Sequence, residues 1–460
     1  MKKRVVSLLL IGIMSFPMFL LGACGGKNEV EFGNLVEEVQ SNYDKSLYVY
    51  DGEPCEISWA HWDSVGPMEE ATSRLIIEGF EKRYPTIKVK LDIISDYQNL
   101  YANNIAAGQV HDVFLVPDGA FRQWSTNGSI FTNLKPFLSQ SFLISEDVIA
   151  NDMFEGAIDR YTTGNDAVLA LPKDIGPYVM YYNKDMFDSM GVEYPPSDRI
   201  MTIEEASAMW RKLTDASKRI YGIAAYPWEG LVWSAGGDFL NEDHTAFPTD
   251  PAQIAGLKKA FTFLQDAMYG EDPFMPTGSD LGGQSDTTLF AAQRCATVVA
   301  GRWEVTSMRT YGFNWDVAYV PAFEGENMQK NCWSGSTGYA VYSGAKNKVA
   351  AWKLVEYIAS REGQELLAAS GFAIPIYNSL ATDKRIVERE LSLGPQNYQV
   401  FIESAKHQPA GTHTWLNSNR WRTDSYDALS AQLFAVNPSS RITVDKYLDN
   451  VKEKANSILR

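Results

Sequence analysis

Cysteine and histidine are scarce in this chain of 460 residues, which contains four of the first and five of the second. No CxxC pair, HExxH pair or mixed Cys/His cluster occurs, so the spacings typical of zinc sites are missing. P-loop, GxSxG and EF-hand spacings are missing as well. A disulfide framework is excluded, although one bridge between Cys295 and Cys332 stays open. The sequence therefore predicts neither a metal ion nor a cofactor.

Positive charge is also in short supply, because 41 Lys and Arg residues face 57 Asp and Glu residues and give a formal charge of -16. No basic run interrupts this acidic balance. Such a field repels phosphate backbones, so we expect no nucleic-acid partner. A composition of 45% hydrophobic and 21% charged residues is that of an ordinary globular protein, and it excludes a disordered or multi-span membrane chain.

Long hydrophobic runs are missing except at the N-terminus. There, the basic start Met1–Arg4 precedes the apolar stretch Val5–Leu21, which ends in Leu21-Gly22-Ala23-Cys24. This pattern is similar to the signal peptide and lipobox of bacterial lipoproteins, which implies cleavage after residue 23 and acylation of Cys24 with diacylglycerol and palmitate. We therefore expect a lipid anchor that holds the protein at the extracytoplasmic face of the cell membrane. A plain signal peptide with a chance cysteine, or an uncleaved signal anchor, are the alternatives.

The mature chain begins with a polar stretch and continues as alternating strands and helices. We expect residues 24–54 to be a tether between the lipid and the folded body. Hydrophobic patterns of period two and period 3.6 alternate after it. The expected elements are strands at 56–60, 89–93 and 112–116 and helices at 68–84 and 98–107. This order is typical of a mostly parallel sheet with helices on both faces.

The second half of the chain repeats this organisation. Thr202-Ile203-Glu204-Glu205 predicts a capping box at the start of a helix that reaches about residue 218. Asp250-Pro251 predicts the start of another helix. Further strands are expected at 179–183, 297–300, 315–320 and 335–343, with a helix at 346–360 and a largely helical tail from about 386 to 460. The sequence thus predicts two α/β units followed by helices.

The middle of the chain carries a specific resemblance. Residues 169–191 read LALPKDIGPYVMYYNKDMFDSMG and are followed by Tyr194-Pro195-Pro196. This block resembles one found in the bacterial extracellular solute-binding proteins, the family that supplies sugar ABC importers. Further matches follow in the family's order over about residues 55–455, and they are Ala106–Gly108 with Asp112-Val113, Trp233–Asp238, Gly301–Trp303, Gly335–Tyr339 and Lys346–Trp352.

The resemblance implies an α/β fold with two lobes, like that of type II periplasmic binding proteins. Each lobe would hold a mixed, mostly parallel sheet flanked by helices, and crossing segments would act as a hinge that closes the lobes on a ligand. The implied first lobe contains 55–171 and 336–373, and the second contains 174–333 and 378–460. The implied crossings are Pro172–Gly176, Trp333–Ser336 and Ile374–Asn378.

A sugar presents C–H patches on its ring faces and hydroxyls around its rim, so its site needs flat apolar side chains and fixed polar groups. In an open α/β sheet such groups gather in the loops beyond the carboxyl ends of the strands. Trp210, Trp315 and Trp352 lie within helix or strand patterns, and we expect them in the core. The candidate ligand contacts, at strand ends and in loops, are His61, Trp62, Asp63, Asp118, Tyr226, Trp228, Trp233, Arg302, Trp303, Ser336, Thr337, Trp415 and Asn417.

Several of these candidates have a second interpretation. Trp303 is the strongest stacking candidate. Asp118 could accept sugar hydroxyls, or it could be a turn residue before Gly119. Asp63 could likewise be a loop cap. Arg302 could donate to the ligand, or it could bridge the two lobes.

The resemblance implies a monomeric protein that binds a sugar and delivers it to the membrane permease subunits of an ABC importer without catalysing a reaction. The number of candidate tryptophans and the length of the chain favour an oligosaccharide over a monosaccharide. The first alternative is a non-sugar solute such as a polyamine, a peptide or a metal complex. Asp63, Asp118 and Asp238 keep that alternative open, because carboxylates among aromatic rings suit a cation. The second alternative is a surface glycosidase that uses a pair of carboxylates beside the same tryptophans.

Overall fold

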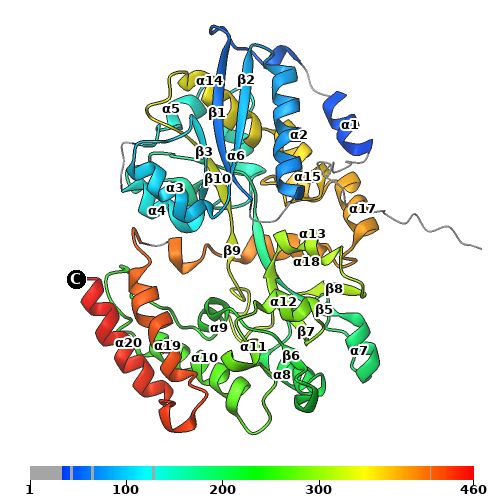
Figure 1. Ribbon diagram of the computed structural model, residues 1–460, viewed down its shortest axis with the longest axis vertical. Coiled ribbons are helices and arrows are strands. Elements are labelled where there is room, and N and C mark those ends of the chain that lie inside the picture. The colour runs from blue at the N-terminus through cyan, green and yellow to red at the C-terminus, as the bar shows by residue number, and fades with distance from the viewer. Residues whose placement is uncertain (1–33, 42–44, 64–66, 127–129, 415) are drawn as a thin grey trace, which may run out of the picture.

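The computed structural model describes residues 34–41, 45–63, 67–126, 130–414 and 416–460. The predicted signal peptide, Cys24 and Trp415 lie outside this part of the chain. Within it, no helix combines the length and the apolar character needed to cross a membrane. The described chain forms two α/β lobes stacked along the long axis of the molecule, with a narrow waist between them (Figure 1).

The first lobe is built on a five-stranded sheet with the order β2-β1-β3-β10-β4. Strand β1 pairs in parallel with β2 and β3, whereas β10 is antiparallel to β3 and to β4. All five residues of β3 are buried, as expected of a strand inside a sheet that is covered on both faces. The strands are β1 (Cys55–Trp62), β2 (Ile87–Ile94), β3 (Val113–Pro117), β4 (Leu171–Pro172) and β10 (Thr337–Val341).

Helices cover the faces of this sheet. Helix α2 carries Glu69 and Glu70 in its first turn and Lys82 and Arg83 in its last, which suits the helix dipole. The helices of this lobe are α2 (Pro67–Arg83), α3 (Tyr97–Ala106), α4 (Asp118–Ser125), α5 (Lys135–Leu138), α6 (Glu146–Asn151), α14 (Lys348–Ala359), α15 (Arg361–Ser370) and α16 (Asn378–Ala381).

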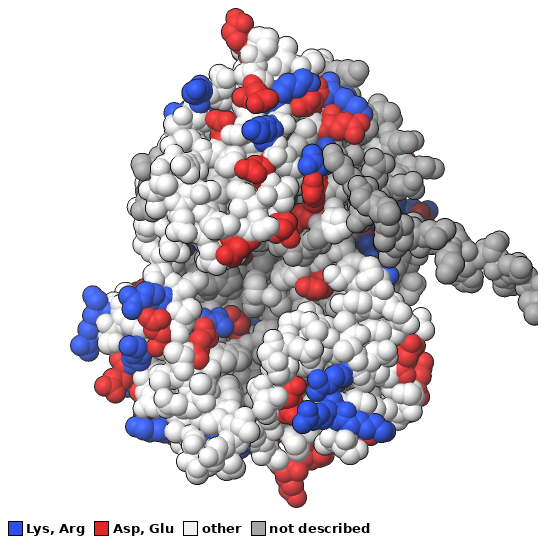
Figure 2. Space-filling view, viewed as in Figure 1, with Lys and Arg blue, Asp and Glu red and all other residues white. Residues whose placement is uncertain are grey.

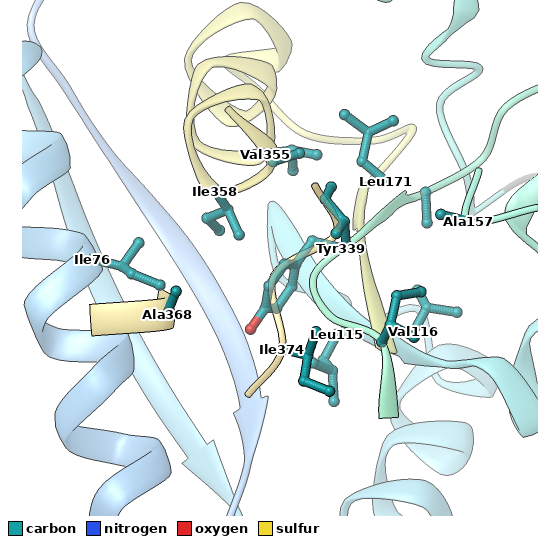
Figure 3. Close-up of a cluster of buried hydrophobic side chains, with 14 of the residues drawn as sticks. Ile76, Leu115, Val116, Ala157, Leu171, Tyr339, Val355, Ile358, Ala368 and Ile374 are labelled. Atoms are coloured by element: carbon teal, nitrogen blue, oxygen red, sulfur yellow. The ribbon is translucent and has the colours of Figure 1, made fainter. Parts of the chain in front are cut away.

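The core of the first lobe lies between its sheet and helices α2, α14 and α15. Tyr339 of β10 stands in the middle of it, with Ile358 of α14 and Leu115 of β3 nearby (Figure 3). Its ring packs edge-on against Trp59 of β1, with 5.2 Å between the ring centroids. Trp352 is buried in the same core, as predicted.

The second lobe is built on a sheet with the order β6-β7-β5-β8, and β9 pairs with the start of β5. Strand β5 is antiparallel to β7 and β8, and only β6 and β7 are parallel. The strands are β5 (Gly176–Asn183), β6 (Tyr221–Ile223), β7 (Cys295–Gly301), β8 (Trp315–Ala318) and β9 (Ser334–Gly335).

Both sheets are therefore mixed, but parallel pairing is less common than the sequence predicts. The strands responsible are β10 and β5, because each enters its sheet from the opposite lobe and runs against its neighbours. Two predicted helix starts are confirmed. Thr202 and Glu205 form the capping box of α8, and the Asp250 side chain caps α10.

The remaining helices surround the second sheet or connect it to the first lobe. They are α7 (Lys184–Met190), α8 (Ile203–Lys212), α9 (Trp228–Ser234), α10 (Pro251–Tyr269), α11 (Gly278–Leu281), α12 (Asp286–Ala291), α13 (Val305–Met308), α17 (Lys384–Leu393), α18 (Gln399–His407), α19 (Ala428–Leu433) and α20 (Val444–Ile458). Trp210 of α8 is fully buried in this lobe, as predicted, and Trp315 is partly buried against the core. Cys295 and Cys332 are buried and not bonded to each other.

The chain passes between the sheets next to the waist. It leaves the first sheet at Pro172 and enters the second at Gly176, and it returns between Gly335 and Thr337. A third strand-like contact joins Ile175 to Ile374. The first two positions coincide with the predicted crossings at 172–176 and 333–336. Residues Ile376 and Asn378 hydrogen-bond to Phe154 and Asp152 of the first lobe, so the third predicted crossing, like the boundaries of the lobes, stays a prediction.

The predicted tether is shorter than expected, because part of it belongs to the folded body. Residues Asn34–Ser41 form helix α1, which packs against α15. Its Val36 and Val39, three positions apart, are buried on one face of the helix. Farther on, the hydroxyl of Tyr48 donates a hydrogen bond of 2.5 Å to the buried Glu362. The expectation of a free tether up to residue 54 is therefore wrong from Asn34 onward.

Candidate ligand-binding cleft

A cavity of about 490 Å³ lies at the waist, where both crossings meet the two sheets. On the face shown in Figure 2, the molecule is hollowed across its middle. Both lobes and the crossings contribute to the walls. The lining residues are Trp62, Glu69, Gln98, Pro117, Asp118, Gly119, Lys173, Asp174, Ile175, Gly176, Arg302, Trp303, Glu304, Trp333, Gly335, Ser336, Thr337, Phe372, Ala373 and Asn419.

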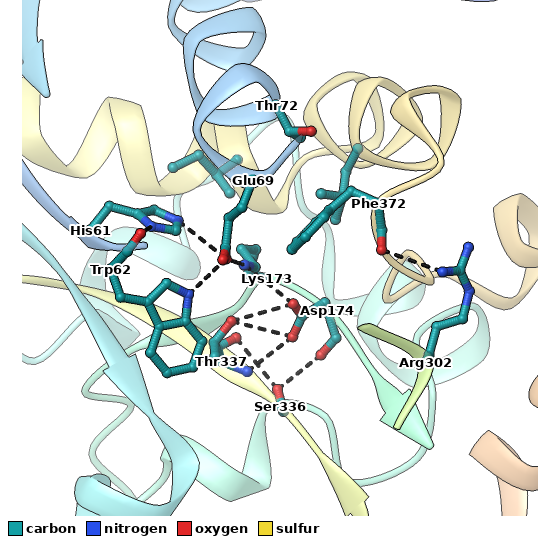
Figure 4. Close-up of polar contacts among 12 residues, drawn as sticks. His61, Trp62, Glu69, Thr72, Lys173, Asp174, Arg302, Ser336, Thr337 and Phe372 are labelled. Atoms are coloured by element: carbon teal, nitrogen blue, oxygen red, sulfur yellow. Dashed lines mark hydrogen bonds and ion pairs between the residues drawn. The ribbon is translucent and has the colours of Figure 1, made fainter. Parts of the chain in front are cut away.

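A hydrogen-bonded network forms the wall on the side of the first lobe (Figure 4). Lys173, on the crossing after β4, donates to Glu69 Oε1 of α2 at 3.0 Å. The indole Nε1 of Trp62, at the end of β1, donates to the same oxygen at 2.7 Å. The Lys173 ammonium also lies 3.3 Å from Asp174 Oδ2, whose other oxygen accepts from the backbone N–H of Thr337 at 3.0 Å. The network thus ties one helix, one strand end and both crossings together.

Burial shapes the charge state of this network. Burial alone would raise the pKa of Glu69, but Lys173, His61 and Trp62 together outweigh burial, and the pKa of Glu69 is lowered. Burial likewise opposes the charge on Lys173, yet Glu69 and Asp174 raise its pKa. The pair is therefore ionised. For Asp174, burial prevails over Lys173 and raises the pKa.

His61 supports this wall from behind. Its Nδ1 donates to the carbonyl oxygen of Trp62 at 2.8 Å, and its Nε2 lies 3.8 Å from Glu69. Burial, together with the nearby Lys173, lowers the pKa of His61 to about 4. The imidazole is therefore neutral at physiological pH and acts as part of the interior.

Asp118 follows β3, begins helix α4 and lines the cavity. Its Oδ1 accepts from the backbone N–H of Gly119 at 2.7 Å, which is the predicted turn contact. Its Oδ2 accepts from the N–H of Ser336 at 3.1 Å and lies 3.4 Å from the guanidinium of Arg160. The carboxylate is thus fixed at the cavity edge by both lobe 1 and a crossing.

Aromatic rings form the opposite wall. Tyr178 of β5 lies 4.5 Å from the ring of Trp333 and 5.3 Å from the ring of Trp303, centroid to centroid. Glycines make room for these rings, because a Cβ on Gly301 would lie 2.2 Å from the Trp303 ring and a Cβ on Gly176 would lie 2.9 Å from it. The second lobe therefore offers broad, flat apolar surfaces to the cavity.

The two interpretations of Arg302 can now be compared. Its guanidinium is almost fully buried and donates to Glu390 Oε2 of α17 at 2.7 Å. It also donates to the carbonyl oxygens of Gly371 and Phe372, at 3.3 and 3.4 Å. These contacts connect the end of β7 to the segments after α15 and in α17, so the bridging interpretation fits the geometry even though part of the side chain lines the cavity.

A second cavity of about 470 Å³ adjoins the first, and Trp333 and Asn419 line both. Two predicted contacts, Tyr226 and Trp228, line this second cavity. Its other lining residues are Tyr178, Ala225, Pro227, Glu229, Asp286, Val299, Arg422, Thr423 and Asp427. Arg422 and Asp427 begin and end a π-helical turn, a rare feature often found at functional sites.

The structure brings most, but not all, predicted residues to the cleft. Trp62, Asp118, Arg302, Trp303, Ser336 and Thr337 line the first cavity. Four others do not line either cavity. His61 and Trp233 are buried in the interior, and Asp63 and Asn417 are exposed to solvent outside both cavities. Asp63 accepts a hydrogen bond from Ser95 instead. Trp415 is outside the described residues.

Other lining residues were not predicted as contacts. Glu69 appears in the sequence as an ordinary acid in a first helical turn, and Lys173 and Asp174 appear as residues of a crossing. The contacts of Glu69 with Lys173 and of Asp174 with Thr337 join segments 104 and 163 positions apart, so no local spacing reveals them. Trp333 could have been predicted as a contact, because it lies close to Gly335 at the start of a predicted crossing.

The arrangement of the cleft suits binding of a polyol. Flat rings can cover the C–H faces of a sugar, while carboxylates, hydroxyls and amides can pair with its rim. Among the described residues, no group of three or more His, Cys, Asp and Glu is placed to hold a metal ion.

Comparison with known proteins places the chain among binding proteins. The family model described as bacterial extracellular solute-binding protein matches residues 66–365. One relative is a maltotriose-binding protein of Pyrococcus abyssi, which is 24% identical over 334 residues, covering 71% of this chain and 68% of that protein.

Solved structures share the fold. An ABC substrate-binding protein of Listeria monocytogenes in complex with cycloalternan superimposes with a TM-score of 0.73 at 23% identity, over 88% of this chain and 99% of that one. UgpB of Mycobacterium tuberculosis in complex with glycerophosphocholine superimposes with a TM-score of 0.68 at 20% identity, over 89% and 99% of the two chains. The two-lobed fold of type II periplasmic binding proteins is therefore confirmed.

Proposed function

The chain belongs to the bacterial extracellular solute-binding protein family, and from that premise we propose that it binds an oligosaccharide outside the cytoplasm and delivers it to the permease of an ABC importer. The observation that carries the proposal is the cleft at the waist, with a polar wall from the first lobe and an aromatic wall from the second. A saccharide between these walls contacts both lobes at once.

Such a ligand would favour the closed arrangement of the lobes. A ligand shifts an open–closed equilibrium only by its difference in affinity for the two states. Trp62 and Asp118 come from the first lobe, and Trp303 comes from the second, so both sets of contacts form together only when the lobes are close. The crossings at 173–175 and 335–337 are the proposed hinge.

The length of the cleft supports an oligosaccharide as the ligand. The two cavities share Trp333 and Asn419 in their linings, so they are neighbours. A ligand of several rings can reach from Trp303 in the first cavity to Trp228 in the second. A single sugar ring would leave one of these aromatic surfaces without a ligand.

We also propose that the mature protein is a monomer held at the membrane through acylated Cys24. The basic start, the apolar stretch and the residues before Cys24 support this anchor. Cys24→Ser removes the acylated thiol, so the variant should be absent from the membrane fraction and should not take up labelled palmitate. A variant that remains fully membrane-bound would contradict the anchor without affecting the proposal for the ligand.

We propose that the bound sugar leaves the protein unchanged. A binding protein needs only to close and release, and the aromatic and hydrogen-bonding walls serve that purpose. The first test is calorimetric titration of the mature chain against neutral mono- and oligosaccharides, followed by recovery of the sugar. Tight binding with the sugar intact is the expected result. Cleavage of the sugar would instead support a glycosidase.

A cationic solute such as a polyamine is a second candidate, and the carboxylates of the cavity favour it. Asp118 and Asp174 lie at the cavity wall beside Trp62 and Trp303. Asp63 and Asp238, which the sequence also suggests for this role, do not line either cavity. Titration with spermidine decides between the candidates, because a polyamine receptor would bind spermidine and no saccharide.

A further inference from the structure

The lining of the cleft is strongly acidic, and this limits which saccharides fit. Among the described lining residues of the two cavities, seven carboxylates accompany three cations. The carboxylates are Glu69, Asp118, Asp174, Glu304, Glu229, Asp286 and Asp427, and the cations are Lys173, Arg302 and Arg422. In Figure 2, acidic side chains border the hollow both above and below.

Lys173 is already neutralised by the protein. Its ammonium lies 3.0 Å from Glu69 and 3.3 Å from Asp174, and 5.1 Å from the ring centroid of Phe372. Its side chain is 4% exposed. An incoming anion would therefore compete with two carboxylates for one buried charge.

The two arginines also form ion pairs within the protein. Arg302 donates to Glu390 and to two backbone carbonyl oxygens, although Glu390 also accepts from Arg309 and Arg389, and Arg302 Nε is buried without a partner among the described residues. Arg422 pairs with Glu229, donates to the hydroxyl of Thr412 at 2.8 Å and lies 3.4 Å from Asp427. Each guanidinium therefore already has a carboxylate partner within the protein.

Two of the carboxylates have no cation of their own. Glu304 and Asp286 make no ion pair with any described residue. Asp286 accepts only from backbone N–H, at 2.9 Å from Thr287. Burial raises the pKa of both side chains, as expected where negative charge is poorly compensated. One of them lies in each cavity.

We infer that the cleft selects saccharides that carry no acidic group. Neutral and amino-bearing saccharides are accepted, and uronates and sugar phosphates are rejected. The inference rests on the proposed function, because it specifies the class of saccharide for the same cleft. An acidic ligand would lose its hydration, meet uncompensated carboxylates and find no cation that is not already paired.

The test uses matched trisaccharides titrated into the mature full chain. Maltotriose, cellotriose and mannotriose serve as neutral parents, and each is compared with derivatives that carry a carboxylate or an amine at C6. We expect the acid to bind at least about 100-fold more weakly than its parent, because a like charge at contact distance in a partly desolvated site costs several times the thermal energy. The amine should bind at least as tightly as its parent.

The results separate the inference from the function on which it rests. An acid that binds as tightly as its neutral parent overturns the inference and leaves the proposed function intact. No binding of any parent, amine or acid overturns the proposed function and the inference with it.

A substitution that removes one charge and keeps the side chain's shape gives a second test. Glu304→Gln removes one uncompensated charge and preserves the shape of the side chain, so it should narrow the parent-to-acid affinity ratio by about tenfold. Glu242→Gln removes a charge of the same kind from the exposed surface, and it should leave the ratio unchanged. An equal ratio in both variants would overturn the role assigned to the lining carboxylates.

Discussion

The two walls of the cleft are built in different ways. On the side of the first lobe, Glu69, Lys173 and Asp174 bind one another and Trp62, so the polar groups are fixed before any ligand arrives. On the side of the second lobe, Tyr178, Trp303 and Trp333 are held by ring contacts and by the space that glycines leave. The first wall is therefore ordered by charge and hydrogen bonds, and the second by shape.

This difference predicts which measurement each wall controls. A buried network costs stability when one member is lost, because the others are left with unpaired charge. A ring that faces a cavity contributes apolar area that only a ligand can cover. Substitutions in the polar wall should therefore change unfolding, whereas substitutions in the aromatic wall should change affinity.

The largest effect should come from breaking the polar wall at its centre. Lys173→Ala leaves Glu69 and Asp174 buried without their cation, and the free energy of unfolding should fall by about 3–5 kcal/mol. Chemical denaturation monitored by circular dichroism measures this loss. Lys82→Ala removes an exposed lysine that pairs with Glu78, and it should cost about 1 kcal/mol or less. Equal losses would show that the network is not a stabilising feature.

The next effect is a loss of stability in acid. The pKa of His61 is lowered from 6.5 to about 4, so the unfolded chain binds a proton at higher pH than the folded one. The contribution of neutral His61 to the free energy of unfolding is therefore fully present above about pH 6.5. It decreases as the pH falls toward 4, by roughly 3 kcal/mol in all.

His61→Phe isolates this contribution. The variant keeps an aromatic ring beside Trp59 and Tyr339 and has no titrating group there, so its unfolding free energy should change little between pH 6.5 and 5. Below that range, carboxylates such as Glu69 add their own dependence. His407→Phe, at an exposed position, should retain the slope of the unsubstituted protein. A slope that persists in His61→Phe would contradict the assignment.

The aromatic wall should be broken by Trp303→Ala. Loss of a large apolar surface should weaken saccharide binding by about 1.5–3 kcal/mol, or roughly ten- to two-hundredfold in Kd. Calorimetric titration measures the change. Phe142→Ala, which shortens an aromatic side chain that is 87% exposed, should leave the affinity as it was. Unchanged binding in a folded Trp303→Ala protein would remove Trp303 from the site.

The smallest effect should come from moving the ring without removing it. In Gly301→Ala the added methyl group would meet the Trp303 ring, which must shift, and affinity should fall by about 1 kcal/mol. Gly312→Ala adds a methyl group where no atom lies within 4 Å, and it should have no effect on affinity. Identical affinities in the two variants would show that the position of the ring is not important.

The sequence predicts the lobes better than it predicts the walls. The capping box at Thr202 and the buried strand after Asp112 are local patterns, and both are present in the structure. The crossings and the two lobes came from a resemblance that extends along the chain. Contacts such as that between Glu69 and Lys173 join segments 104 positions apart and leave no local signal.

The structure places two of the predicted contacts, His61 and Trp233, in the interior and away from both cavities. His61 and Trp62 both approach Glu69 Oε1, at 3.8 and 2.7 Å, but the His61 ring packs inward against Trp59 and Tyr339, and only Trp62 lines the cavity. Periodicity does separate Trp228 from Trp233, because five positions in α9 place them on different sides of the helix. Trp228 lines a cavity, and Trp233 is buried.

The docking of helix α1 against α15 bears on the proposed lipid anchor, because it shortens the segment between Cys24 and the folded body. If Cys24 is the anchor, ten residues lead from it to Asn34, where the folded body begins, and a fully extended chain of that length spans about 35 Å. A free segment up to Cys55 would span about 110 Å. With such an anchor, the short connection would keep the side of the first lobe that carries α1 toward the bilayer. It would also raise the effective concentration of the protein at transporters in the same membrane.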